Sequence, residues 1–221
     1  MRDEYDKQLR ILHDRVTEMG ELCEQAIEIT SMAVANPEKD VFNTINGIEE
    51  EINKIEREVE LRCTNLVLRQ QPVASDLRNI SAATKIVTNL ERIGDHAFDI
   101  ADILFNENAD RVVTKIDIKG MADTAVEMLR KIIKAYMNGD LALVKDVINM
   151  DDKVDDDFIK LQNEIVQKIV KEDKDQANYL DLMLIVKYYE RVGDHCVDIA
   201  EWVAYAITGR LYKDKEILDI Q

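Results

Sequence analysis

The sequence predicts an all-α fold, with six long helices forming two tandem homologous three-helix bundles. Three observations predict it. The 221 residues include only 7 glycines and 2 prolines, too few for the many tight turns of a β-sandwich or barrel. Apolar residues recur at the three- and four-residue spacing of an α-helical seam. A twelve-residue segment of the first half returns 99 residues later, which indicates a structural repeat.

Two turn signals divide the first half into three helices. Asn36-Pro37-Glu38 is typical of an N-cap followed by proline at the first helical position. Pro72 ends the second helix, and Ser75 is expected to cap the third. The second helix carries an apolar seam, with charged residues off it: Ile45, Ile48, Ile52, Ile55, Val59 and Leu66.

The second half follows the same plan. Asn138-Gly139-Asp140 supplies a left-handed glycine after one helix and an N-cap for the next. The acidic stretch Lys171 to Asp175 predicts another turn, and Thr208-Gly209 ends the last helix. Asp151 stands where the seam of the fifth helix expects an apolar residue. The apolar members of that seam are Val147, Val154, Phe158, Leu161 and Ile165.

The repeat defines the two units. Residues 91–102 and 190–201 are identical at eight of twelve positions. Upstream, residues 48–53 match residues 150–155 at an offset of 102, so the first unit has three extra residues between its second and third helices. The predicted domains are residues 1–108 and 109–221.

Composition excludes several classes of function. The formal net charge is 29 − 45 = −16, which repels nucleic acid and anionic lipid headgroups. The longest uncharged stretch is the nine residues 29–37, against about 20 for a membrane-spanning helix. The N-terminus has no apolar signal region, and the three cysteines show no paired spacing. We therefore expect a cytoplasmic protein with no nucleic-acid partner and no direct membrane insertion.

Each repeat carries carboxylates along one helix face. At about 100° per residue, the four in each repeat project within about 80° of one another. The first acidic stripe is Glu91, Asp95, Asp99 and Asp102, and the second acidic stripe is Glu190, Asp194, Asp198 and Glu201. Like charges at this spacing repel one another, so a cation is expected to compensate them.

The neighbouring helices could supply an opposing wall. Asp151 and Asp155 lie four residues apart in the second unit, and Glu49 and Asn53 take the matching positions in the first. Oxygen-only ligation favours Mg²⁺, Mn²⁺, Ca²⁺ or iron, with iron, Mn and Mg as the leading candidates. Asn53 is neutral, so the first site should be weaker or differently occupied. The alternative is that the stripes are solvated faces without metal.

Other residues of the repeat favour structural roles. The Glu-x-x-His motif of ferritin-like di-metal sites is absent, because Ile93 and Val192 precede the histidines by three residues. His96 and His195 are therefore expected to be hydrogen-bonded residues, either buried or at the boundary of the core, rather than ligands. The glycines of the two repeats, Gly94 and Gly193, indicate that a backbone or a bulky side chain approaches the helix closely there. Nucleophile elbows, P-loops and dinucleotide fingerprints are missing, so the sequence does not predict an enzyme.

The run from Gln70 to Arg78 and the doubled Glu-Arg-[Ile/Val]-Gly-Asp-His resemble the PhoU family of phosphate-signalling proteins. The similarity extends from Met19-Gly20 to Gly209. It implies a cytoplasmic, usually dimeric, six-helix protein that acts with the phosphate ABC transporter, including its ATPase, and a phosphate-sensing histidine kinase. Members of the family are negative regulators of the phosphate-starvation response and restrain phosphate uptake.

The resemblance also implies metal clusters held by Glu/Asp-x-x-x-Asp motifs. These motifs fall on Glu91 with Asp95, Asp151 with Asp155, and Glu190 with Asp194, whereas Glu49 with Asn53 departs from the pattern. The leading hypothesis is a regulatory adaptor of phosphate homeostasis that binds metal. The alternatives are a metal-storage or metal-dependent redox bundle, and a structural dimer with solvated stripes.

Overall fold

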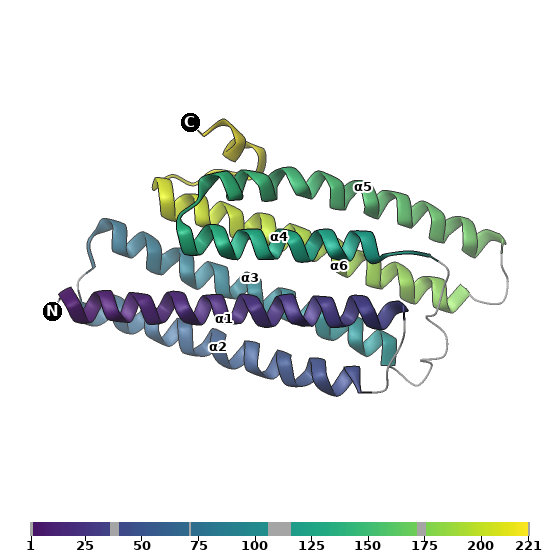
Figure 1. The fold of residues 1–221 in the computed structure, drawn as a ribbon, viewed down its shortest axis with the longest axis horizontal. Helices are drawn as coiled ribbons and strands as arrows, with labels where there is room; N and C mark the ends of the chain where they lie inside the picture. The colour runs from purple at the N-terminus through teal and green to yellow at the C-terminus, as the bar shows by residue number, and fades with distance from the viewer. Residues whose placement is uncertain (1, 36–39, 71, 106–115, 172–175, 221) are drawn as a thin grey trace.

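The computed structural model describes residues 2–35, 40–70, 72–105, 116–171 and 176–220, and none of these residues is in a strand. The elements are α1 (Arg2–Ala35), α2 (Val41–Gln70), α3 (Ala74–Phe105), α4 (Lys119–Asn138), α5 (Leu141–Lys171), α6 (Gln176–Thr208) and a short 3-10 helix, η1 (Asp214–Asp219). The predicted all-α class and six long helices are confirmed (Figure 1).

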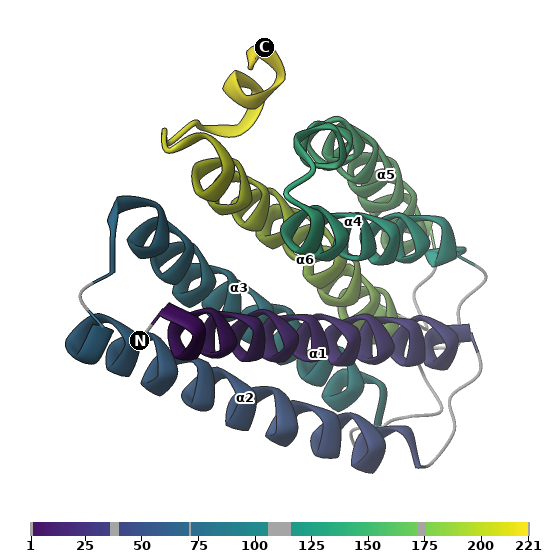
Figure 2. The same cartoon turned by 60° about the vertical axis from the view of Figure 1, so that its left-hand side comes forward.

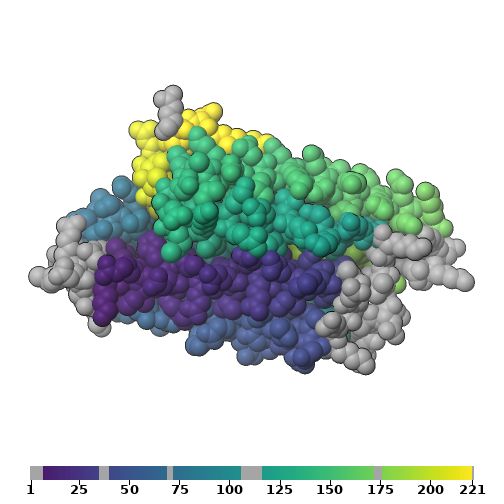
Figure 3. All heavy atoms as spheres, viewed as in Figure 1, coloured from purple at the N-terminus to yellow at the C-terminus, as the bar shows by residue number. Residues whose placement is uncertain are grey.

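The helices form two three-helix layers that face each other. In one layer α1, α2 and α3 contact one another, and in the other α4, α5 and α6 do so (Figures 1 and 2). The layers meet where α3 contacts α6 and α1 contacts α4. Figure 3 shows the surfaces of α1 and α4 lying against each other along the molecule. Arg130 of α4 donates from Nε to Glu24 of α1 at 3.0 Å across this contact.

The predicted seams form the core. All six apolar seam residues of α2 are buried, and so are Val147, Val154, Leu161 and Ile165 of α5. Phe158 is only partly buried. A single apolar cluster runs through both layers, so the two repeats stabilise each other. Each fully buried Ile or Leu side chain contributes about 1.5–3 kcal/mol.

Most described helix ends follow the predicted signals. Gly139 is left-handed at φ 62°, and the Asp140 side chain accepts a hydrogen bond from the backbone N–H of Ala142 at 2.9 Å. α6 ends at Thr208, and Gly209 has φ 78°. The prediction for Ser75 is wrong, because α3 begins at Ala74 and places Ser75 in its first turn.

Other turn predictions lie outside the described residues. These are residues 36–38, residue 71, residues 172–175 and the domain boundary between residues 108 and 109. Among the described helices, none is long and apolar enough to cross a membrane.

Candidate metal-binding stripes

Asp151 of α5 lies against Gly193 of α6. A Cβ atom added at Gly193 of α6 would lie 3.2 Å from Asp151 Oδ1 and 3.2 Å from Val154 Cγ1. In the first unit, the same addition at Gly94 would lie 3.0 Å from Ile52 Cδ1. The prediction that these glycines allow close packing is confirmed. Because Gly193 has no side chain, the Asp151 carboxylate can lie directly against α6.

The carboxylates of α5 and α6 disfavour one another's ionisation. Burial raises the pKa of Asp151 to about 7, and the negative charges of Asp155 and Asp194 add to the effect. Partial loss of hydration, followed by repulsion from Glu190, raises the pKa of Asp194 to about 6. The pKa of Asp155 is raised by the same two causes in the same order. These four side chains from two helices therefore form one electrostatic unit.

Lys187 is a cation in contact with this group. Its Nζ ion-pairs with Glu190 one turn away on α6 and lies 5.1 Å from the centre of the Phe158 ring. Its charge also opposes the rise in the pKa of Asp194 and of Asp155. A metal ion held by Glu190 would therefore have to displace Lys187.

The first unit contains a weaker version of this arrangement. Burial, then repulsion by Asp95, raises the pKa of Glu91, and Glu49 adds to it from α2. Arg92 offsets these charges, with its guanidinium 3.4 Å from Glu91 and 3.8 Å from Asp95. The Asn53 amide donates a hydrogen bond to the Glu49 carboxylate. Arg92 has a counterpart in Arg191 of the second unit, so the difference in formal charge between the two sites comes from Asn53, which is neutral where the second unit has Asp155.

The outer members of the stripes turn toward other elements. Burial raises the pKa of Asp99, and a hydrogen bond from Tyr188 of α6 opposes that rise. Burial also raises the pKa of Asp198, which Lys213 opposes. Asp99 therefore faces the other layer, and Asp198 faces the C-terminal segment, residues 209–220.

The C-terminal segment closes one end of the second stripe. Glu201 is buried and accepts hydrogen bonds from Lys213 Nζ at 2.6 Å and from the backbone N–H of Asp214 at 3.0 Å. Lys215 Nζ lies 2.7 Å from Asp152 on α5. Ile217 is fully buried, which anchors η1 over α5 and α6 (Figure 2). The cation that compensates Glu201 is therefore a lysine of this chain. Sequence reasoning missed this contact, although Lys213 and Lys215 are the signal that could have indicated it.

The two repeat histidines meet between α3 and α6. Their ring centres are 5.3 Å apart, and His195 Nδ1 lies 2.9 Å from Asn89 Oδ1. Burial, followed by the charge of His195, lowers the pKa of His96 to about 4. Within the described residues, neither ring nitrogen of His96 has a hydrogen-bond partner. The expected position is confirmed for both rings, because His96 is buried and His195 is partly buried. The expected hydrogen bond is found for His195 only.

The described carboxylates do not converge into one coordination sphere. No group of three or more His, Cys, Asp or Glu side chains in the described part of the chain is arranged to hold a metal ion. The structure brings Asp151, Asp155, Glu190 and Asp194 into mutual electrostatic range without completing a site. Their oxygen donors suit a hard cation, and metal binding stays a prediction.

The chain is similar in sequence to known proteins over both repeats. The family model described as the PhoU domain matches residues 16–104 and 118–203. The chain is 34% identical over 209 residues to a phosphate-specific transport system accessory protein PhoU homolog of Clostridium acetobutylicum, covering 93% of this chain and 95% of that relative. It is 31% identical to the homolog of Borreliella burgdorferi, with 95% and 97% covered.

Two crystal structures share the fold. PhoU from Pseudomonas aeruginosa matches with a TM-score of 0.86 at 27% identity, covering 93% of this chain and all of that one. The phosphate transport system regulatory protein PhoU from Streptococcus pneumoniae matches with a TM-score of 0.85 at 23% identity, and 95% and 99% of the two chains are covered. The similarity extends over both repeats.

Proposed function

The chain belongs to the PhoU family, and from this premise we propose that it is a regulatory accessory protein of a phosphate transport system rather than an enzyme. The observation that carries the proposal is the match over both units, to relatives named as accessory proteins of phosphate-specific transport. A protein that couples two partners needs a stable body with separate surfaces. Two layers with one shared apolar core supply such a body.

The finer proposal is a negative regulator of the phosphate-starvation response. The protein would act in the cytoplasm, as a homodimer, and couple the state of the transporter ATPase to the phosphate-sensing histidine kinase. Its surface charge supports protein partners over nucleic acid, because a net charge of −16 repels phosphodiester backbones.

We also propose that the second unit binds a metal ion through Asp151, Asp155, Glu190 and Asp194. The raised pKa values support it, since carboxylates that are costly to ionise alone are stabilised by a bound cation. Bound there, the ion would supply positive charge that holds α5 and α6 together. Glu49, Glu91 and Asp95 would form the weaker first site, where Arg92 already offsets part of the charge.

Affinity purification from the source organism tests the function. Tagged protein should co-elute with the transporter ATPase and with the kinase at physiological salt. A variant with Glu91→Gln, Asp95→Asn, Glu190→Gln and Asp194→Asn should bind them more weakly without losing them, because the metal would shape the surface without being the contact. The opposite result, sustained iron oxidation in air with neither partner bound, would favour the redox bundle.

A further inference from the structure

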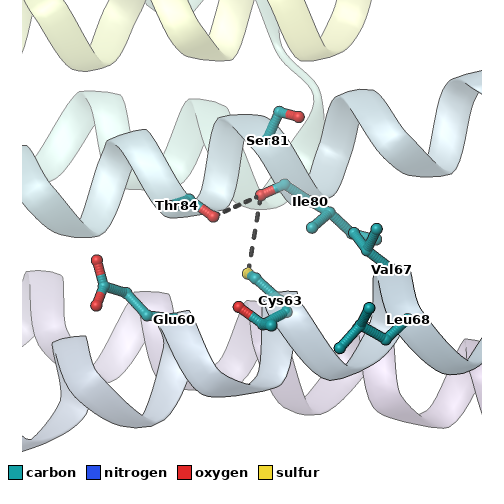
Figure 4. Close-up of a pocket in the computed structure, with 8 residues that line it drawn as sticks. Glu60, Cys63, Val67, Leu68, Ile80, Ser81 and Thr84 are labelled. Atoms are coloured by element: carbon teal, nitrogen blue, oxygen red, sulfur yellow. Dashed lines mark hydrogen bonds between the residues drawn. The ribbon is translucent and has the colours of Figure 1, made fainter.

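A groove lies between α2 and α3 on the face that carries the first acidic stripe. The cavity has a volume of about 490 Å³, and six of its lining residues are Glu60, Val67, Leu68, Ile80, Ser81 and Thr84 (Figure 4). None of these residues belongs to the predicted metal sites. This α2–α3 groove is therefore a surface feature separate from the predicted metal sites.

The floor of the α2–α3 groove is formed by buried side chains. Cys63 and Ile80 are buried there. The Ile80 carbonyl accepts hydrogen bonds from the Thr84 hydroxyl at 3.1 Å and from the Cys63 thiol at 3.8 Å (Figure 4). The Cys63 thiol, the Thr84 hydroxyl and the Ile80 carbonyl are hydrogen-bonded to one another, so these groups do not need a polar ligand. The floor offers aliphatic surface.

The rim at one end is exposed and apolar. Leu68 is 75% exposed and Val67 is 42% exposed, although both stand beside the hollow. Leu77, one turn before Ser81 on α3, is 46% exposed. Solvated leucines around a concave surface are typical of a binding site for an apolar partner.

The other end of the groove is acidic. Glu60 lies there, opposite the end formed by Val67 and Leu68 (Figure 4). Glu56 lies one turn before Glu60 on α2, and Glu91 of α3 is within electrostatic range of Glu56. Burial and then the charges of Glu91 and Glu60 raise the pKa of Glu56, so these carboxylates lie within electrostatic range. The groove therefore changes from acidic to apolar over the two turns between Glu60 and Val67, about 11 Å.

We propose that the α2–α3 groove binds an amphipathic helix of a partner protein, with aliphatic side chains over Val67 and Leu68 and a lysine or arginine beside Glu60. A helix laid in the groove would present such residues about two turns apart on one face. Charge complementarity selects this occupant, because a basic side chain beside Glu60 would be attracted by Glu60, Glu56 and Glu91 together, whereas an uncharged aliphatic molecule would not. The proposal rests on the proposed accessory function and names the surface through which a partner is held.

The second unit provides an internal control. At the repeat offsets of 102 in α5 and 99 in α6, Gln162 replaces Glu60, Val170 replaces Leu68 and Leu180 replaces Ser81. Val170 is 79% exposed and Leu180 is 58% exposed, so this surface is also apolar. It lacks the acidic position, and a basic helix should prefer the first unit.

Peptide binding tests the proposal directly. The probes are fluorescein-labelled 20-residue peptides that tile the cytoplasmic segments of the transporter subunits and of the kinase from the same organism. Fluorescence anisotropy on the full chain should find a basic amphipathic peptide that binds. Leu68→Ser and Glu60→Lys should each weaken its Kd at least tenfold, while Val170→Ser should change it less than twofold. The three positions are exposed, and circular dichroism checks that each variant is folded.

A charge exchange sharpens the test. A peptide with glutamate in place of its basic residue should bind the Glu60→Lys variant better than it binds the parent. Unchanged affinity in both groove variants, or equal loss in Val170→Ser, would overturn the proposal. So would a shift from dimer to monomer in Leu68→Ser by light scattering, since that would assign the groove to a second copy.

The peptide experiment and the affinity purification can give different answers, so the groove proposal and the accessory function can fail independently. If no peptide binds while the parent still co-elutes with the ATPase or the kinase, the groove proposal fails and the accessory function stands. If the parent co-elutes with neither, the accessory function fails as well.

Discussion

Replacing Asp151 with asparagine should stabilise the metal-free protein at neutral and alkaline pH. Asp151 faces α6 from the seam of α5, and burial together with neighbouring carboxylates raises its pKa to about 7. In the unfolded chain the same carboxyl group has an ordinary pKa near 3.8. Ionising it therefore costs the folded state free energy that the unfolded state does not lose, and the amide removes that cost.

The difference between the two pKa values sets a ceiling of about 4 kcal/mol, at about 1.4 kcal/mol per pKa unit. Asp151 is partly exposed, and water screens its neighbours, so we expect a gain of about 1–2 kcal/mol. Between about pH 4 and pH 7 the folded state binds more protons than the unfolded state. The free energy of unfolding of the parent due to this group should therefore fall as pH rises through that window. Below pH 4, where both states are protonated, the advantage of Asp151→Asn should vanish.

Urea unfolding followed by circular dichroism, in excess chelator from pH 4 to pH 8, measures this difference. Asp152→Asn is the matched control, because Asp152 is exposed and ion-pairs with Lys215. Its loss should cost less than about 1 kcal/mol. A variant Asp151→Asn that is less stable than the parent at pH 8, or equally stabilised at pH 4 and pH 8, would refute the electrostatic reasoning.

Two further measurements test the metal site and the close packing beside it. Mn²⁺ at a hundredfold excess over its Kd should raise the free energy of unfolding by about 2.7 kcal/mol. The double variant Glu190→Gln with Asp194→Asn should lose the second unit's response in thermal melts, and an unchanged response would place the ligands elsewhere. Gly47→Ala should stabilise α2 by about 1 kcal/mol, because a Cβ there meets nothing within 4 Å. Gly193→Ala should instead destabilise by about 1 kcal/mol, since Val154 is buried and cannot move away; equal effects in urea unfolding would contradict this.

The helices could be predicted from the sequence because their signals are local. The α2 seam repeats every three or four residues, and Gly139 and Gly209 adopt the left-handed conformation that ends a helix. The packing of the layers could not be predicted in this way. Arg130 meets Glu24 across 106 residues, and the Tyr189 hydroxyl meets Thr30 across 159. No spacing within one helix encodes which distant helix it will contact.

Helical periodicity indicated which carboxylates lie near one another, and it indicated their surroundings only in part; metal binding by them stays a prediction. The 100° rotation per residue grouped Glu190 with Asp194, and the four-residue spacing of Asp151 and Asp155 predicted an opposing wall beside them. The charges of Asp194 and Asp155 do act on Asp151. The rotation also grouped Glu201 with Glu190 and Asp194. Glu201 is, however, buried under Lys213. Helical periodicity describes the direction of a side chain and says nothing about a segment that folds back over it. The partner of Glu201 was therefore decided by tertiary structure.

The two copies of the motif have carboxylates at the same positions but different charged and polar partners, so the two units differ in their electrostatics. In the first unit Arg92 and Asn53 already accompany the carboxylates, and the adjoining groove ends at the acidic Glu60. In the second unit Lys187 and the C-terminal segment provide the counter-charges, and a cation must displace Lys187 from Glu190. On our proposals, metal acts mainly on the second unit and the partner helix on the first. The two events can influence each other through the contacts between the layers, where α3 meets α6 and α1 meets α4. Any such influence must be reciprocal: a metal ion that strengthens partner binding must itself be held more tightly when the partner is bound.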